Sequence, residues 1–173
     1  MQVATGRKGI ELFLMEWYVG VLIPVTFPGQ KTACQRRTNM VTDNDLGAFF
    51  SSPAYGVAGA STNRDKYGNK VLRCYQQNGR KVYGINPRAG EIEGALCVAT
   101  VAELPDDVES ISVITPPAIT VQVVSAAIAR GIKNIWMQPG AEHPGAVAEC
   151  RKHGVNVIAD GSCILVVLGY SDH

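Results

Sequence analysis

The sequence predicts an α/β protein with a Rossmann-like, doubly wound sheet that is mainly parallel and carries helices on both faces. One local pattern recurs along the chain: a helical segment ends at a glycine, and a short β-branched or aromatic run follows. The glycines are Gly79, Gly131 and Gly154, and glycine readily adopts the left-handed conformation that ends many helices. Strands that alternate with helices pair in parallel through right-handed crossovers, which places helices on both faces of the sheet.

The strands are predicted from these short runs and their flanking turn residues. In chain order they lie at residues 54–58, 81–85, 111–115, 133–137, 155–158 and 163–168. The sheet therefore has about five or six strands, depending on whether the last apolar run joins it. The helices between them carry apolar stripes at three-to-four spacing, which predicts core contacts. These stripes are Tyr67, Val71, Cys74 and Tyr75 in the first helix and Ile119, Val123, Ala126 and Ala127 in the second.

Length and composition fit a single globular domain. The chain has 173 residues, of which 46% are apolar and 18% charged, and its net charge is +1. This balance excludes a disordered or fibrous chain and gives non-specific nucleic-acid binding little support. The five cysteines are an odd number without a CxxC pair, which favours a reducing compartment over a disulfide framework. We therefore expect a cytoplasmic protein.

The N-terminal part differs from the rest, and we divide the chain into an unassigned extension, residues 1–45, and a domain, residues 46–170. Residues 10–27 are apolar enough to suggest a signal or membrane segment. Glu11, Glu16 and Pro24 argue against a membrane span, because a carboxylate within a bilayer helix costs about 2.5–3.5 kcal/mol. Secretion or organelle import through this segment stays open, and so does its use in pairing subunits of a homo-oligomer.

A small-residue turn follows the first predicted strand, where open parallel sheets bind their ligands. Gly59, Ala60, Ser61 and Thr62 would let the backbone approach a phosphate, although a purely structural turn is the alternative. The turn is neither GxGxxG nor a P-loop. Residues 59–90 contain seven Lys or Arg and one Asp, a balance of seven minus one, or +6. Such a basic region suits a polyanionic ligand.

The loops after the next three strands narrow the choice of ligand. The second strand ends at Asn86, Pro87 and Arg88, without the acid with which NAD enzymes commonly bind the ribose hydroxyls. Arg88 suits a ribose phosphate, which both NADP and coenzyme A carry. Residues 115–117 read Thr-Pro-Pro, either an apolar ledge for the ligand or a simple strand stop, and residues 138–140 close the same edge.

Together these four strand-end motifs resemble the stand-alone CoA-binding domain family, a relative of the N-terminal domain of the succinyl-CoA synthetase alpha subunit. The motifs are Gly59-Ala60-Ser61, Asn86-Pro87, Ile114-Thr115-Pro116-Pro117 and Trp136-Met137-Gln138-Pro139-Gly140. The resemblance covers residues 46–168 and implies a Rossmann-like fold in which the first turn holds the CoA diphosphate. It implies that the ligand contacts Gly59, Ala60, Ser61, Thr62, Asn86, Pro87, Thr115, Pro116 and Gln138. From charge we add Lys66, Lys70 and Arg88, and from position in the same loops Asn63, Pro117, Pro139 and Gly140.

The sequence offers few groups for catalysis. His143, Cys150 and His153 do not match a known zinc spacing, and no Tyr-x-x-x-Lys pair, GxSxG or HExxH motif occurs. Cys163 follows the fifth strand, where it is either a core thiol or within reach of the cofactor thiol. The related synthetase also needs a second domain with a phosphorylated histidine. We therefore do not expect acyl-CoA ligase activity as the default.

We therefore expect a non-catalytic protein that binds coenzyme A or an acyl-CoA, with a small nucleotide as its partner and no nucleic acid. The alternative is an NADP-dependent oxidoreductase or another NAD(P)-binding Rossmann protein, which the generic fold and Arg88 would also fit. One departure from the family concerns the first strand, residues 54–58, which is less aliphatic than is usual there.

Overall fold

The computed structural model describes residues 43–172 of the chain. The apolar run at residues 10–27 and most of the predicted extension lie outside the described residues. Within residues 43–172, no helix is long and apolar enough to cross a membrane.

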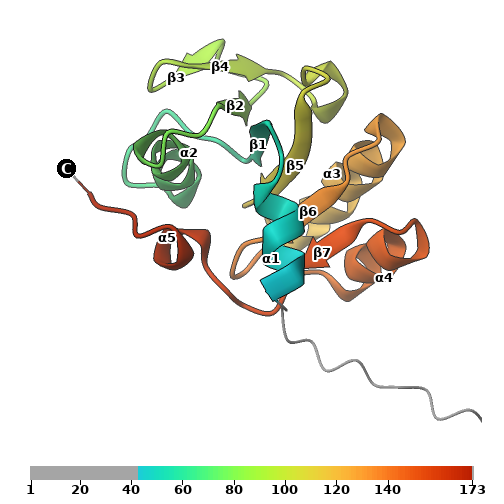
Figure 1. Cartoon of the computed structure of the whole chain (residues 1–173). Coiled ribbons are helices and arrows are strands. Elements are labelled where there is room, and N and C mark those ends of the chain that lie inside the picture. Colours follow the sequence, from blue (N-terminus) through green and yellow to red (C-terminus); the bar gives the residue numbers. More distant parts are fainter. Residues whose placement is uncertain (1–42, 173) are drawn as a thin grey trace, which may run out of the picture. The chain divides into compact units, whose positions relative to one another are not determined.

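The described part forms a seven-stranded sheet in the order β3-β4-β2-β1-β5-β6-β7 (Figure 1). The strands are β1 (Ala54–Ala58), β2 (Val82–Ile85), β3 (Glu91–Ile92), β4 (Ala95–Val98), β5 (Val108–Val113), β6 (Asn134–Met137) and β7 (Asn156–Ile158). All neighbours pair in parallel except β3 and β4, which form an antiparallel hairpin at one edge. The chain moves outward from β1 in one direction and from β5 in the other, so the strand order reverses between them.

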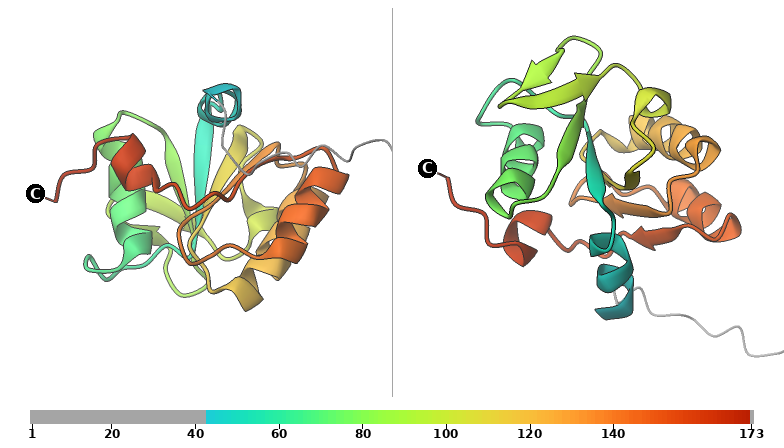
Figure 2. Two further views of the ribbon diagram at one scale, coloured as in Figure 1. Left: turned by 90° about the horizontal axis from the view of Figure 1, so that it is seen from below. Right: turned by 45° about the horizontal axis from the view of Figure 1, so that its top comes forward.

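Helices cover both faces of this sheet, as Figure 2 shows. They are α1 (Asp43–Phe50), α2 (Tyr67–Gln77), the short 3-10 helix η1 (Val101–Glu103), α3 (Pro117–Arg130), α4 (Pro144–Lys152) and α5 (Ile164–Val167). One core lies between the sheet and helices α3 and α4. It includes Val113, Val124 and Cys150. The other includes Tyr75 of α2 and Ile164 of α5. The doubly wound, mainly parallel arrangement predicted from the sequence is confirmed.

An aromatic cluster fixes α1 on the face of the sheet that also carries α2 and α5. Phe49 meets the rings of Phe50 and Trp136 edge-on, at centroid distances of 5.4 and 5.2 Å. Tyr55 stacks on Tyr75 at 4.7 Å, and Phe49, Tyr55, Tyr75 and Trp136 are almost completely buried. The first strand is therefore well packed although it is less aliphatic than usual, since all five of its residues are buried.

Three details differ from the sequence-based prediction. The run at residues 163–168 forms α5 and the turn that ends it rather than a strand. The sheet has seven strands because of the hairpin β3–β4, which is too short to give an alternating pattern. Two members of the apolar stripes face outward: Tyr67 is 49% exposed and Ile119 is 44% exposed. Each lies in the first turn of its helix, beyond the end of the sheet.

Candidate functional site

The four strand-end motifs lie side by side along one edge of the sheet. In the strand register, Ala58 is paired with Ile85 on one side and with Val113 on the other, and Val113 is paired with Met137. The residues that follow these strand ends must therefore lie in a row. The row contains the loops at residues 59–66, 86–88, 114–117 and 138–140. Its centre, between β1 and β5, is the point where strand order reverses, at which open α/β sheets bind ligands.

Two glycines allow the loop after β1 to lie in close contact with its neighbours. Gly59 has a φ of +91°, and a Cβ there would lie 3.4 Å from the backbone of Ile114, in the loop after β5. Gly68, in the first turn of α2, lies against the carbonyl of Gly59, and a Cβ on Gly68 would come within 2.0 Å of that oxygen. The start of α2 therefore rests directly on the backbone of the loop, with no room for a side chain between them.

This loop presents unpaired backbone donors. Among residues 43–172, the amides of Ala60, Ser61 and Thr62 donate to no protein acceptor. Helix α2 begins with Lys66 at its N-cap, whose side chain caps no amide, and the first turn contains no acid. A helix N-terminus with uncapped amides attracts anions. The loop and the helix start thus form one patch of donors suited to phosphate oxygens.

Asn86 connects the loop after β2 to this loop. Its side-chain Nδ2 donates to the carbonyl of Ala60 at 2.9 Å, and its Oδ1 accepts from the amide of Arg88 at 2.8 Å. Its backbone amide donates to Val98 at 2.9 Å. An asparagine is needed here because the side chain donates to one loop and accepts from the other. Pro87 and Arg88 follow at the surface, where both are exposed.

The basic side chains counted in the sequence do not all serve this site. Arg80 and Lys81 lie before β2, at the opposite end of the sheet, where Lys81 pairs with Asp107 at 2.7 Å. Arg64 contacts Glu93 at 3.6 Å. In the described part of the chain, Lys66 and Arg88 have no side-chain partner. These two exposed cations are therefore the ones available to an anionic ligand.

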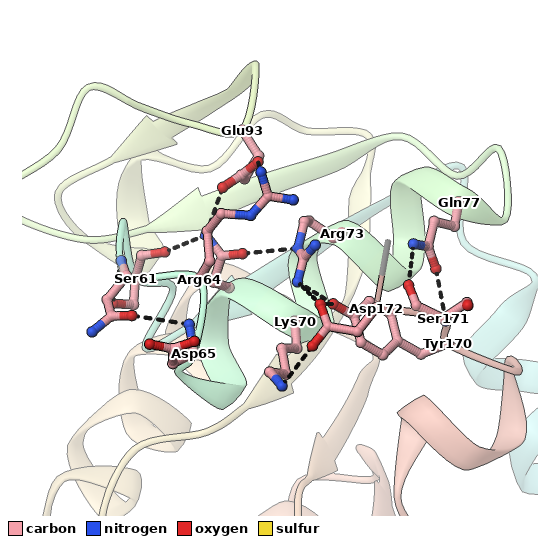
Figure 3. A network of polar contacts seen from close by, with 12 residues as sticks. Ser61, Arg64, Asp65, Lys70, Arg73, Gln77, Glu93, Tyr170, Ser171 and Asp172 are labelled. Atoms are coloured by element: carbon pink, nitrogen blue, oxygen red, sulfur yellow. Dashed lines mark hydrogen bonds and ion pairs between the residues drawn. The ribbon is translucent and has the colours of Figure 1, made fainter.

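Lys70 and Arg73 are held instead by the C-terminal segment, as Figure 3 shows. Asp172 accepts from Lys70 at 2.9 Å and from Arg73 at 2.6 Å. Tyr170 also bonds to both Arg73 and Asp172. The hydrogen bond from Lys70, followed by those from Arg73 and Tyr170, lowers the pKa of Asp172 well below its usual range. Lys70, predicted to bind the ligand, is thus already neutralised by a residue of its own chain.

The loop after β5 has a different character. Pro116 is the N-cap of α3 and Pro117 its first residue, so this helix start lacks the donors that α2 provides. Thr115 and Thr120 share a hydrogen bond of 3.0 Å between their hydroxyls, which fixes the turn. The prolines and Ile119 are exposed. This side of the site offers apolar surface rather than donors.

Gln138, at the end of β6, is the most buried of the predicted site residues, at 1% exposure. Its Oε1 accepts from the amide of Ile164 at 3.0 Å, while its Nε2 has no partner within residues 43–172. Pro139 and Gly140 are exposed, and the amide of Gly140 donates to Glu142 at 2.6 Å. The fourth motif thus brings one buried amide group, rather than the whole triplet, toward the interior of the edge.

Sequence reasoning missed two residues that shape the site. Gly68 has a signal in the sequence, because a glycine in the first helical turn after a phosphate loop is typical of close packing between helix and strand. Asn69 has none that we recognise. It is completely buried, and its Nδ2 donates to the carbonyl of Ser61 at 2.9 Å and to Glu93 at 3.1 Å. Asn69 therefore also fixes this loop, at the residue next to the one that Asn86 contacts.

Comparison with known proteins assigns the family. Residues 54–169 match the CoA binding domain family. The chain belongs to this family. It is 28% identical over 135 residues to the ADP-forming acetate–CoA ligase II of Archaeoglobus fulgidus, a match that covers 71% of this chain and 20% of the ligase. The chain thus matches about a fifth of the length of that curated relative.

Two solved structures match this chain over almost their whole length. A conserved hypothetical protein from Pyrococcus furiosus is 39% identical, with a TM-score of 0.63 over 66% of this chain and 97% of that one. A hypothetical protein from Pyrococcus horikoshii OT3 is 26% identical, with a TM-score of 0.69 over 74% of this chain and 90% of that one. The family resemblance inferred from the four motifs is confirmed, and the NADP alternative gains no support from these matches.

Proposed function

We propose that this protein binds coenzyme A at the carboxyl edge of its sheet and catalyses no reaction on it. The observation that carries the proposal is the set of backbone amides at Ala60, Ser61 and Thr62 that have no acceptor within residues 43–172, next to the start of α2, where the Lys66 side chain caps no amide. These donors suit the diphosphate of the ligand. Membership of the CoA binding domain family supports CoA in particular.

The loops after β2 and β5 would contact the other parts of the ligand. The side chain of Arg88 extends from the loop after β2 with no partner in the described residues, so a ribose phosphate is a suitable anion for it. Pro116 and Pro117 offer apolar surface to the adenine or the pantetheine arm. These groups bind and orient a ligand. Backbone amides, amide side chains and prolines transfer no protons near neutral pH, which supports a binding role.

Isothermal titration of the full chain tests this proposal. We expect micromolar or tighter binding of CoA, and no comparable heat from NADPH. Acetyl-CoA incubated with the protein should remain intact when followed by liquid chromatography. Absence of CoA binding would reject the ligand, and turnover of the thioester would reject the non-catalytic role.

The ribose phosphate is tested by pairing one variant with two ligands. The substitution Arg88→Gln should weaken CoA binding at least about tenfold, because a charge-assisted bond contributes roughly 1.5–3 kcal/mol. Dephospho-CoA, which lacks that phosphate, should bind the variant and the unaltered protein equally well. Equal losses for both ligands would place Arg88 at the diphosphate instead.

Two lysines of the same helical region should behave differently. The substitution Lys66→Gln should raise the Kd for CoA about five- to tenfold, because within residues 43–172 this side chain at the start of α2 has no charged partner. The substitution Lys70→Gln is its matched control and should change the Kd less than about twofold, since Asp172 already neutralises Lys70. A larger effect at Lys70 would show that the ligand displaces the C-terminal segment.

A further inference from the structure

Cys163 lies at the same sheet edge as the candidate CoA site. It is the N-cap of α5, in the segment that follows β7, and its side chain is partly exposed. Its Sγ is 3.8 Å from the hydroxyl of Tyr67. Tyr67 is the first residue of α2 and directly follows Lys66 of the phosphate loop. The fold thus brings a thiol from near the end of the chain to the helix on which the diphosphate would rest.

Two buried polar atoms in the segments that flank or contact the Cys163 region have no partner within residues 43–172. Over residues 43–172, three buried side-chain polar atoms lack a hydrogen bond, and two of them are Nε2 of Gln138 and Oγ of Ser162. Ser162 directly precedes Cys163, and Gln138 accepts from the amide of Ile164, which directly follows it. An unpaired buried donor costs about 1–3 kcal/mol, and such atoms are rare in native proteins.

Gln138 Nε2 and Ser162 Oγ, which lack hydrogen bonds within residues 43–172, indicate where a ligand with hydrogen-bonding groups would lie. The arm that joins the diphosphate of CoA to its thiol contains two amides, each able to donate and to accept. Gln138 Nε2 offers a donor to such an amide, and Ser162 Oγ offers either role. An arm held there would run from the loop after β1 toward α5, and its end would approach Cys163.

The other described thiols are less suited to react. Cys74 and Cys150 are completely buried, and burial raises the pKa of each to about 11. Burial also raises the pKa of Cys97. The thiolate is the reactive form of cysteine, so a buried thiol with a raised pKa reacts slowly. Cys163 combines partial exposure with a position at the ligand edge.

We propose that Cys163 forms a reversible mixed disulfide with the thiol end of CoA bound at this site. This inference rests on the proposed CoA binding. The oxidant is the symmetrical disulfide of CoA, one half of which occupies the site. The Cys163 thiolate attacks the sulfur of the bound half, and the S–S bond of the ligand breaks. The other half leaves as a thiolate and takes the proton released by Cys163, so one disulfide replaces another.

Intact-protein mass spectrometry of the full chain tests this reaction. CoA disulfide should add the mass of one CoA less two hydrogens, and peptide mapping should locate the addition at Cys163. Pantethine, the corresponding disulfide without nucleotides, should react at least about tenfold more slowly at equal concentration, because binding raises the effective concentration of the ligand sulfur. A reducing agent should restore the original mass.

Matched variants and a second measurement distinguish CoA binding from the reaction of Cys163. The substitution Cys163→Ser should abolish the adduct and leave titration with reduced CoA unchanged, whereas Cys97→Ser should keep the adduct. If reduced CoA binds but Cys163 reacts no faster with CoA disulfide than with pantethine, the disulfide proposal is wrong and CoA binding stands. If reduced CoA binds neither the unaltered protein nor the Cys163→Ser variant, both proposals fail.

Discussion

The substitution Gly68→Ala is expected to weaken CoA binding by about 100-fold or more and to destabilise the fold. A Cβ at this position would lie 2.0 Å from the carbonyl oxygen of Gly59 and 2.9 Å from its carbonyl carbon. Both are backbone atoms, so the contact cannot be relieved by turning a side chain. Either α2 moves away from the sheet or the loop after β1 is displaced.

Both responses separate the loop amides from the start of α2. Loss of amide–phosphate bonds worth about 1.5–3 kcal/mol each should weaken CoA binding by about 100-fold or more. Overpacking should lower the free energy of unfolding by about 1–3 kcal/mol. Titration calorimetry with CoA and urea unfolding measure the two effects.

Gly47 provides the matched control for this substitution. It also lies in a helix, α1, but a Cβ there would meet nothing within 4 Å. The substitution Gly47→Ala should therefore raise the free energy of unfolding by about 0.5–1 kcal/mol, because alanine loses less conformational entropy in a helix. It should leave CoA binding unchanged. If Gly68→Ala behaved like Gly47→Ala, the close contact between helix and loop would be refuted.

The second large effect is expected at Asn86. The substitution Asn86→Ala removes the donor to Ala60 and the acceptor for Arg88, whose distances are 2.9 and 2.8 Å. Ala60 is 4% exposed, so its carbonyl would lose a partner that water replaces poorly, at a cost of about 1–3 kcal/mol. With the loop no longer fixed, we expect CoA to bind about tenfold more weakly.

The substitution Asn86→Asp should be more severe than Asn86→Ala. The carboxylate keeps an acceptor for Arg88, but it faces the carbonyl of Ala60 with a negative charge and opposes the phosphates of the ligand. We expect at least about 100-fold weaker CoA binding, since like charges in close contact cost several kcal/mol. Titration at low and high salt would show the electrostatic part, which should shrink at high salt.

Asn78 is the control for Asn86. It lies at the opposite end of α2, where its Nδ2 donates to Cys74 at 2.9 Å and to Leu168 at 3.2 Å. The substitution Asn78→Ala should lower the free energy of unfolding by about 1 kcal/mol without changing the Kd for CoA. An equal loss of affinity in Asn78→Ala and Asn86→Ala would attribute the effect to general destabilisation.

The sequence predicted the elements that its local patterns define strongly. Gly131 ends α3 in the left-handed conformation, with a φ of +85°, and the strand after it forms as expected. The short hairpin of β3 and β4 was missed, because a strand of two residues carries no periodicity. The run at residues 163–168 was assigned to a strand because its branched residues favour one. There Ile164 packs into the core beside α2, and α5 forms instead.

Local turn residues and strand runs were enough to predict the doubly wound class and the order of the loops, and the resemblance of the four motifs to a known family predicted CoA as the ligand. Which charges remain available to a ligand depends on tertiary contacts. Asp172 is about one hundred residues from Lys70 and Arg73 in the chain, and nothing local in the sequence pairs them. The same holds for the contact between Tyr67 and Cys163. Contacts between distant segments depend on how helices pack on the sheet, so they appear only once the chain is folded.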